Sequence, residues 1–296
     1  MKFMAQDTPV IIIFDSGLGG TSILKEIISL NLSQQLIYVA DNQYLPYGLQ
    51  TKDFIEKRTC EIFSSLNQQY HIEVAVIACN TATAYAANFL RGKFKFSIVA
   101  MEPGIKPAIN LTKNNNIGIL ATEGTIKSSR FISLVDRFTS DQHKICIIPG
   151  VGLVEEIENQ STSDKKLDAI LLPIIKQLLQ DKVDTLVLGC THYPLIKNKL
   201  TKLLPEVQIV DTSKAVLKVL TGYIDQIDPS EQKTILFMMS KEEGSYLSKI
   251  KKLTDFSKIE QIEFVKRSYT SSRNRDNLQH LCHGDLNTPL DEEPTN

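Results

Sequence analysis

TLVLGCTHYP, at Thr185–Pro194, has a pattern that VAVIACNTAT repeats at Val74–Thr83. Each segment is a short aliphatic run that ends in a small residue, a cysteine and two polar residues. A short run without polar positions is typical of an interior strand of a parallel sheet, which is buried on both faces. Cys79 and Cys190 are therefore expected at the carboxyl ends of two strands, where open α/β sheets bind their ligands.

The two cysteine segments belong to two larger units of similar order. VIIIF leads into a glycine-rich turn that begins at Asp15, and IGIL leads into a turn that contains Thr122; a helical pattern follows each turn. Asp15 precedes Cys79 by 64 positions, and Thr122 precedes Cys190 by 68. This similar spacing indicates an internal duplication. We expect two equivalent thiols that face one another across one site.

These patterns predict an α/β fold of two pseudo-symmetric domains, each a mainly parallel sheet flanked by helices, with the active site between them. Pro103 and Pro107 mark the crossing from one domain to the other. We assign residues 1–103 and 214–268 to a discontinuous first domain and 104–213 to the second. The polar segment 269–296 has little periodicity and is expected to be a disordered tail.

The composition of the 296 residues excludes several classes of protein. A formal net charge of −1 gives no electrostatic footprint for nucleic acid or for an anionic membrane. No apolar run reaches the roughly 18 to 20 residues of a membrane span, and Asp7, Pro9 and Asp15 interrupt the N-terminal segment where a signal peptide needs an apolar region. We therefore expect a cytoplasmic protein. Its five cysteines are odd in number and irregularly spaced, which predicts free thiols.

The sequence offers no convincing metal or cofactor motif. His280, Cys282 and His283 cluster near the C-terminus, but their spacing fits no standard zinc pattern and no fourth ligand is nearby. The glycine-rich turn lacks the lysine of a phosphate-binding loop and the full dinucleotide fingerprint. We expect neither a metal nor a cofactor.

Five motifs in order resemble those of the bacterial glutamate racemases, within the cofactor-independent aspartate/glutamate racemase superfamily. They are FDSGLGG (Phe14–Gly20), ADNQYLPYG (Ala40–Gly48), ACNTAT (Ala78–Thr83), GILATEGT (Gly118–Thr125) and GCTHYP (Gly189–Pro194). The resemblance is strong over residues 10–215 and weak beyond them. Five motifs in register are far more specific than any one of them.

The resemblance implies a cofactor-free interconversion of L-glutamate and D-glutamate, which supplies D-glutamate for peptidoglycan. It implies that Cys79 and Cys190 act as base and acid on opposite faces of the substrate. His192 matches the assisting histidine of the family, and Asp15 and Glu155 match its assisting acidic residues. Glu156 stays an alternative to Glu155, because the preceding sequence departs from the commoner family pattern. The positions that match the family's substrate contacts are Asp15, Ser16, Tyr47, Gly48, Asn80, Thr81, Thr122, Thr191 and His192.

The chemistry of these residue types agrees with that reading. Racemisation removes the α-proton from one face and returns a proton to the other, so it needs two proton-transfer groups. A thiol becomes an effective base when a helix N-terminus or a cation favours its thiolate, and hydrogen bonds must stabilise the carbanion. A single cysteine at a strand end is more often a small buried hydrophobe. Two at equivalent positions of a duplicated unit favour catalysis.

Other readings stay open at this point. The substrate could be aspartate or another acidic amino acid, and a non-catalytic amino-acid-binding regulator could use the same fold. A phosphohydrolase with Asp15 as nucleophile would need a second carboxylate two positions on, where the sequence has Gly17. The loop ADNQYLPYG has the form of Gram-negative enzymes, some of which need a muramyl-nucleotide activator. The sequence leaves open that requirement, and whether the protein is a monomer or a homodimer.

Overall fold

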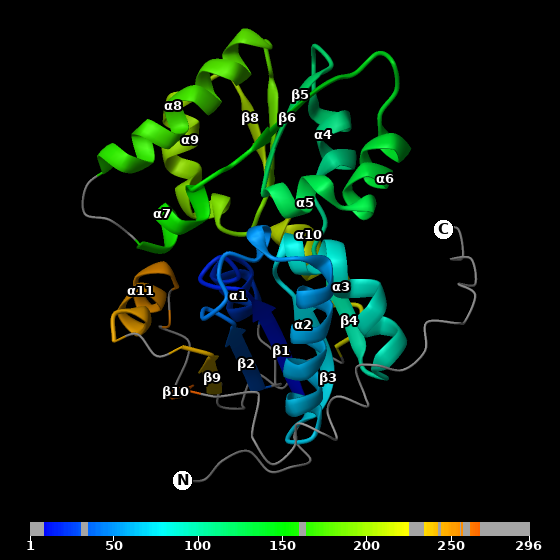
Figure 1. Cartoon of the computed structure of the whole chain (residues 1–296), viewed down its shortest axis with the longest axis vertical. Helices are drawn as coiled ribbons and strands as arrows, with labels where there is room; N and C mark the ends of the chain where they lie inside the picture. Colours follow the sequence, from blue (N-terminus) through cyan, green and yellow to red (C-terminus); the bar gives the residue numbers. More distant parts are fainter. Residues whose placement is uncertain are drawn as a thin grey trace.

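The computed structural model describes residues 9–30, 35–159, 164–224, 234–241, 244–254, 256 and 261–266. Two parallel sheets lie one above the other (Figure 1). The first sheet contains β1 (Pro9–Asp15), β2 (Gln35–Ala40), β3 (His71–Ile77), β4 (Ser97–Ala100), β9 (Thr234–Met239) and β10 (Gln261–Lys266). The second contains β5 (Asn116–Ala121), β6 (Lys144–Pro149), β7 (Thr185–Gly189) and β8 (Gln208–Val210).

Helices flank both sheets. Those associated with the first sheet are α1 (Thr21–Ser29), the 3₁₀ turn η1 (Tyr47–Leu49), α2 (Lys52–Asn67), α3 (Asn80–Lys93), α10 (Ser213–Leu220) and α11 (Tyr246–Leu253). Those associated with the second are α4 (Ile105–Leu111), α5 (Glu123–Lys127), α6 (Ser129–Phe138), α7 (Leu153–Asn159), α8 (Asp164–Gln180), the 3₁₀ turn η2 (Tyr193–Ile196) and α9 (Lys197–Leu203). The predicted α/β class, with two mainly parallel sheets flanked by helices, is confirmed.

The strand order reveals the internal duplication that the sequence indicates. The first sheet runs β10-β9-β2-β1-β3-β4 and the second runs β6-β5-β7-β8, so β1 to β4 and β5 to β8 follow the same order. Every pairing between strands is parallel. The segment after α10 returns to the first sheet, where β9 pairs with β2. The domain boundaries themselves stay a prediction.

The core of the first half is built around β1, which is buried from Val10 to Asp15. Strand β1 lies between β2 and β3, so its backbone groups are paired on both sides and each face can be covered by helices. One face packs against α2 and α3, and the other against α1, α10 and α11. Two similar clusters cover the faces of the second sheet. This burial fixes the strand ends at which the polar residues lie.

Residues 123–138 form two helices, because the Ser128 side chain accepts a hydrogen bond from the Phe131 N–H and caps α6. Cys146 in β6 is only partly buried and donates to Asp181 at 3.1 Å. The tail and its His280, Cys282 and His283 lie outside the described residues.

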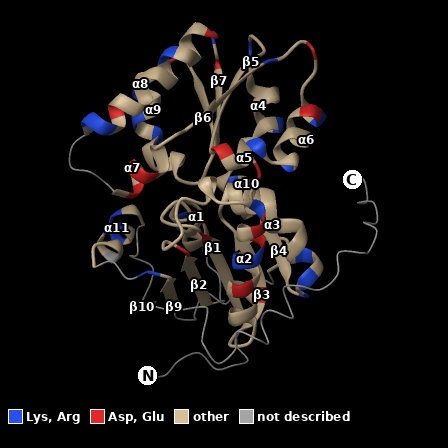
Figure 2. Cartoon of the chain, in the orientation of Figure 1, with Lys and Arg blue, Asp and Glu red and all other residues tan. Residues whose placement is uncertain are grey.

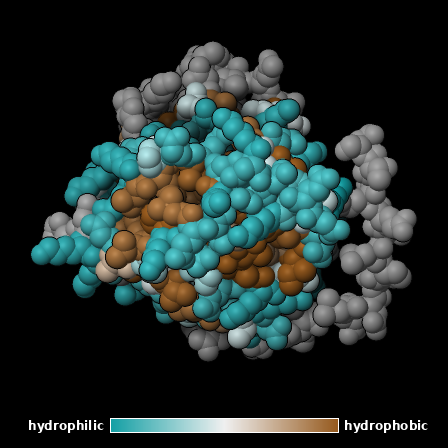
Figure 3. Space-filling model, turned by 90° about the horizontal axis from the view of Figure 1, so that it is seen from above, coloured by the Kyte–Doolittle hydropathy of each residue, from teal (hydrophilic) through white to brown (hydrophobic). Residues whose placement is uncertain are grey.

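The surface carries both signs of charge on the helices, whereas the strands hold few charged residues (Figure 2). Viewed onto the second half, hydrophobic areas alternate with hydrophilic ones (Figure 3). Among the described residues, no helix combines the length and the apolar character needed to cross a membrane. The same residues contain no group of three or more His, Cys, Asp and Glu side chains arranged to hold a metal ion.

Candidate active site

The two sheets face each other (Figure 1), and the two predicted thiols are close enough for the charge of Cys190 to act on the Cys79 thiol. Cys79 follows β3 by two residues, and Cys190 directly follows β7. Both are buried, with exposed fractions of 5% and 6%. The strands that carry them are equivalent in the strand order, so the duplication places the two thiols at matching positions.

Cys79 is the N-cap residue of α3, and its Sγ accepts a hydrogen bond from the Ala82 N–H at 3.5 Å. The Ser16 hydroxyl lies 3.8 Å from the same sulfur. Burial and the negative charge of Asp15 raise the pKa of the Cys79 thiol to about 12, against the opposing effect of the Ala82 amide. Without a ligand, this thiol therefore holds its proton.

Cys190 lies beside His192, which in turn contacts Glu158. Its Sγ lies 3.8 Å from Nδ1 of His192, and Nε2 of His192 lies 2.6 Å from Oε1 of Glu158. Burial alone would lower the pKa of His192, but its hydrogen bonds to Cys190 and Glu158, and their charges, raise it well above its ordinary value. The imidazole is thus held in its charged form beside the thiol.

Asp15 ends β1 and is fully buried. Its Oδ1 accepts from the Gly17 N–H at 2.7 Å, and its Oδ2 accepts from the Thr191 hydroxyl at 3.1 Å. Burial raises the pKa of Asp15, although His192 and the Gly17 amide oppose the increase. The carboxyl group therefore links the first sheet to the residue that follows Cys190.

The glycine-rich turn after β1 packs tightly against the second half. A Cβ on Gly19 would lie 2.5 Å from both His192 Nδ1 and Thr191 Oγ1, and a Cβ on Gly17 would overlap Glu158. The backbone N–H of Leu18 donates to Glu158 Oε1 at 2.5 Å. Only residues without a side chain allow this approach, which explains Gly17 and Gly19 of FDSGLGG.

Hydroxyl groups join the start of α3 to the start of α5. Thr81 Oγ1 lies 2.8 Å from Thr122 Oγ1 and 3.2 Å from Thr125 Oγ1, and these two are 2.9 Å apart. Beside them, both polar atoms of the Asn80 side chain are buried without a hydrogen-bond partner among the described residues. A buried amide without partners costs free energy unless a ligand satisfies it, so Asn80 is well suited to bind one.

Tyr47 and Gly48 lie in η1, which contacts the same hydroxyl cluster. The Tyr47 hydroxyl donates to Asp41 Oδ2 at 2.7 Å, so it is already used within the first half. A Cβ on Gly48 would lie 2.8 Å from the Thr122 Cβ. At this predicted position the phenol is engaged by Asp41, and the backbone of η1 lies against Thr122.

Of the sequence-predicted acidic residues, the structure brings Asp15 to the site but places Glu158, not Glu155 or Glu156, against His192. Glu155 and Glu156 are half-buried, and the charge of Glu155 acts on the Tyr193 phenol. The reason is helical geometry: in α7, Glu158 lies one turn after the buried Val154 and shares its face. A glutamate on the apolar stripe of a helix is the signal that could have identified it.

The fold is that of an α/β protein with two parallel sheets, and its candidate site contains two buried thiols at equivalent strand ends. The family model for Asp/Glu/hydantoin racemases matches residues 11–220, and the chain belongs to this family.

Several relatives and solved structures resemble the chain closely. It is 43% identical over 217 residues to a glutamate racemase of Pseudomonas aeruginosa, covering 73% of this chain and 81% of the relative. It is 38% identical over 218 residues to that of Klebsiella pneumoniae, covering 71% and 75%. The crystal structure of Escherichia coli glutamate racemase with L-glutamate and the activator UDP-MurNAc-Ala superposes with a TM-score of 0.74 at 32% identity, over 87% of this chain and 98% of that one.

Proposed function

We propose that the protein is a glutamate racemase that interconverts L-glutamate and D-glutamate with Cys79 and Cys190 as its proton-transfer groups. The pair of thiols is the observation that carries this proposal. Both are buried at equivalent strand ends, and they are close enough for the charge of Cys190 to act on the Cys79 thiol. By family resemblance, the D-glutamate produced supplies peptidoglycan synthesis.

The reaction balances with the two thiols alone. The thiolate of one cysteine takes the α-proton, and the bonding electron pair stays on the α-carbon as a planar carbanion. The thiol of the other cysteine donates its proton to the opposite face and becomes a thiolate. The configuration is inverted and no electrons are gained or lost. In the reverse direction the two cysteines exchange roles.

Binding of an amino acid would correct the unfavourable protonation state of Cys79. Its raised pKa has burial as the first cause and the charge of Asp15 as the second. An α-ammonium group paired with the Asp15 carboxylate would offset the second cause. The pKa of the Cys79 thiol is then lower when substrate is present than in the free enzyme.

The remaining groups can hold the substrate and the carbanion. Asn80 offers an N–H donor and a carbonyl acceptor, both without partners among the described residues. Thr81 and Thr191 offer hydroxyl groups, and the backbone N–H groups at the start of α3 suit a carboxylate. Preorganised donors of this kind stabilise the negative charge that develops in such a reaction. Charged His192, held by Glu158, lies beside the Cys190 sulfur and can donate a hydrogen bond to it.

The activity is tested by incubating the purified protein separately with L-glutamate and D-glutamate in deuterated water without an added cofactor. We expect the optical rotation to decay to zero from either enantiomer while deuterium enters the α-position. Racemisation of aspartate at a higher kcat/KM would shift the assignment to another acidic amino acid. Binding of glutamate without deuterium incorporation would contradict catalysis and favour an amino-acid-binding regulator.

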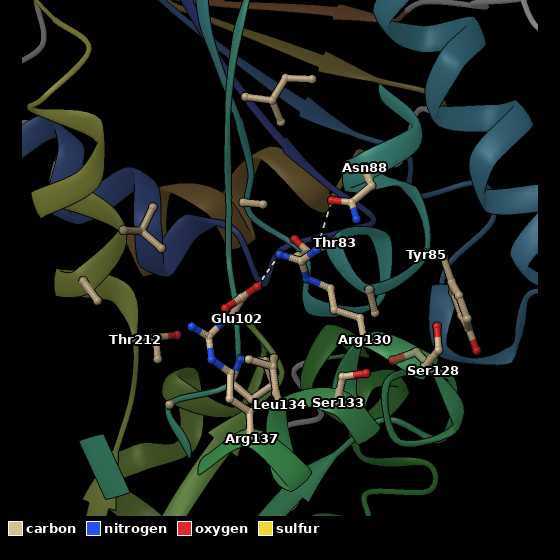
Figure 4. Close-up of a pocket in the computed structure, with 18 of the residues that line it drawn as sticks. Thr83, Tyr85, Asn88, Glu102, Ser128, Arg130, Ser133, Leu134, Arg137 and Thr212 are labelled. Atoms are coloured by element: carbon tan, nitrogen blue, oxygen red, sulfur yellow. Dashed lines mark hydrogen bonds and ion pairs between the residues drawn. The ribbon is translucent and has the colours of Figure 1, made fainter. Parts of the chain in front are cut away.

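We further propose that a muramyl nucleotide binds outside the thiol site. A cavity of about 1290 Å³ lies between α3, α6 and α10, and neither cysteine lines it (Figure 4). Arg130 crosses it to form an ion pair with Glu102 and a 3.1 Å hydrogen bond to Asn88. Its basic side chains are Lys52, Arg91, Lys106, Lys127, Arg130 and Arg137, against the acidic Glu56 and Glu102. Basic groups, arginine especially, suit a diphosphate.

The solved E. coli relative with UDP-MurNAc-Ala supplies the ligand to test. We expect UDP-MurNAc-Ala to raise kcat/KM by about 5- to 150-fold, the usual range of an allosteric coupling. Arg137→Met should weaken this activation without changing the rate measured in its absence. Lys25→Met, at an exposed position on α1 away from the cavity, is the control. Equal activation in both variants would contradict this location.

A cytoplasmic location is part of the same proposal. The cysteines that the structure describes, Cys60, Cys79, Cys146 and Cys190, are free thiols. A two-thiol reaction needs both sulfurs reduced, and the cytoplasm keeps thiols reduced. Cell fractionation alongside a periplasmic marker protein tests this assignment, and recovery of the protein with that marker would contradict it.

A further inference from the structure

Asp41, which follows β2, has a fully buried carboxylate that accepts three hydrogen bonds. Arg58 of α2 donates from Nε to Oδ2 at 2.9 Å and from Nη2 to Oδ1 at 2.7 Å. The Tyr47 hydroxyl donates to Oδ2 at 2.7 Å. A buried carboxylate is tolerated only when it is paired in this way, and the two-point arginine contact also fixes its orientation. None of these three groups transfers a proton in the mechanism above.

The buried pair holds the loop that leads to η1. The Arg58 guanidinium lies 4.8 Å from the centre of the Tyr44 ring, and the Tyr47 ring packs against Phe14 and Phe54 at 6.1 and 6.4 Å between ring centres. The loop is therefore tied to α2 at both Tyr44 and Tyr47. The start of the loop is held separately, because Asn42 and Gln43 form hydrogen bonds to Lys241 and Ser240 after β9.

The turn η1 in turn touches the hydroxyl cluster beside Cys79. Gly48 is pressed against Thr122, and a Cβ on Gly124 would lie 3.0 Å from the Gly48 carbonyl and 3.1 Å from Thr81 Cγ2. Thr81 and Thr122 share a 2.8 Å hydrogen bond. A shift of η1 would therefore disturb groups from both halves of the molecule where substrate is expected.

We propose that Arg58 and Asp41 are positioning residues of the racemase, which hold the Tyr47–Gly48 backbone against Thr122 and thereby set the affinity for substrate. This inference rests on the proposed function. Neither residue touches the substrate, and both act through η1. Small displacements of binding groups are costly: about 1 Å can change a rate by about 100-fold.

Arg58→Lys is the informative variant, because lysine keeps the positive charge beside Asp41 but cannot make the two-point contact. We expect KM for glutamate to rise about tenfold while kcat changes less than about threefold. Tyr47→Phe keeps the ring packing and removes one donor, and should change KM in the same direction by a smaller factor. The control is Glu61→Gln, which removes a charge 3.7 Å from Arg58 Nη1 and leaves both Arg58–Asp41 hydrogen bonds in place, so KM should stay unchanged.

The racemisation assay of the wild-type protein distinguishes a failure of this inference from a failure of the proposed function. If the wild type does not racemise glutamate, the proposed function fails and the variants carry no kinetic comparison. If it does, an unchanged KM in Arg58→Lys overturns the positioning role. A lower melting temperature with a proportional loss of active protein and an unchanged KM also overturns it, since that result describes a merely structural pair.

Discussion

Glu158 is the residue at which three parts of the chain meet. Its carboxylate accepts from Leu18 N–H at 2.5 Å and contacts His192 at 2.6 Å, while its carbonyl oxygen accepts from Lys249 Nζ at 2.8 Å. Leu18 belongs to the turn after β1, His192 follows β7, and Lys249 lies in α11. One side chain therefore orients the histidine beside Cys190 and connects the two halves.

Glu158→Gln should lower kcat by about 10- to 100-fold, because the neutral amide no longer favours charged His192 beside Cys190. Glu155→Gln is the matched control on the same helix, and we expect it to change kcat less than about threefold. Steady-state kinetics of both variants test the assignment. A larger loss in Glu155→Gln than in Glu158→Gln would return the assisting role to Glu155.

The His192–Glu158 pair makes the free energy of unfolding depend on pH. Because the pKa of His192 is raised in the folded protein, its contribution is fully present below about pH 6.5 and is lost as the pH rises through the folded pKa. The free energy of unfolding of the wild type should therefore exceed that of Glu158→Gln most at about pH 6 and least at about pH 9. Urea titrations at both values measure this, and a difference that grows with pH would contradict it.

Asp15→Asn tests the carboxylate that the structure places beside both halves. The amide oxygen can still accept from the Gly17 N–H, whereas the NH2 group can only donate to the Thr191 hydroxyl. The side chain also carries no charge to pair with an α-ammonium group. We expect kcat to fall by about 100-fold with a smaller change in KM, as for the loss of a group that acts mainly in the transition state. An unchanged kcat would limit Asp15 to a structural role.

At the scale of the elements, the glycine-rich turn between β1 and α1 shows how closely the halves must approach. Gly19→Ala would bring a methyl group within 2.5 Å of His192 and Thr191. We expect at least about a tenfold loss of kcat, since the reacting groups must move apart. Gly92→Ala is the control: it lies in α3 with open space around it, and should stabilise the protein by about 0.5–1 kcal/mol without affecting kcat. Equal losses of kcat in Gly19→Ala and Gly92→Ala would contradict the role of the turn in bringing the halves together.

Much of this architecture could be predicted from local patterns. Uniformly apolar runs such as Val10–Phe14 identify parallel strands, and the repeated strand, turn and helix order reveals the duplication. The contacts that assemble the site are long-range: Leu18 and Glu158 are 140 positions apart, and Asp15 and Thr191 are 176 apart. Periodicity does not report such pairs, which is why Glu158 and the Arg58–Asp41 pair were missed.

At the scale of the whole molecule, the halves close over the thiols. The exposed fractions of Cys79 and Cys190 are 5% and 6%, so we expect substrate entry to need a movement of one half against the other. The contacts between the halves include Leu18 with Glu158 and Thr81 with Thr122. We expect closure to exclude water from the carbanion.

The integrity of the first half depends on the segment after α10. A chain that ends at Ile224 lacks β9, whose buried side chains include Ile235, Phe237 and Met239 on one face and Leu236 and Met238 on the other. Burial of each of these side chains stabilises the fold by about 1.5–3 kcal/mol. Their combined loss is therefore comparable with the whole free energy of unfolding of a typical domain, about 5–15 kcal/mol. We expect this chain to lose cooperative unfolding. A chain that ends at Lys266 should retain it, and equal melting curves for the two would contradict the account.

The central claim is that the two thiols serve opposite faces of one substrate. Its most direct test is α-deuterium exchange, measured separately for L-glutamate and D-glutamate, in Cys79→Ser and Cys190→Ser. We expect the rate of racemisation to fall by at least about 100-fold in both variants. Each variant should still exchange the α-proton of one enantiomer without inverting it, and the two variants should differ in which enantiomer they exchange. Racemisation at the wild-type rate in either variant, or retained exchange of the same enantiomer in both, would contradict the two-thiol mechanism.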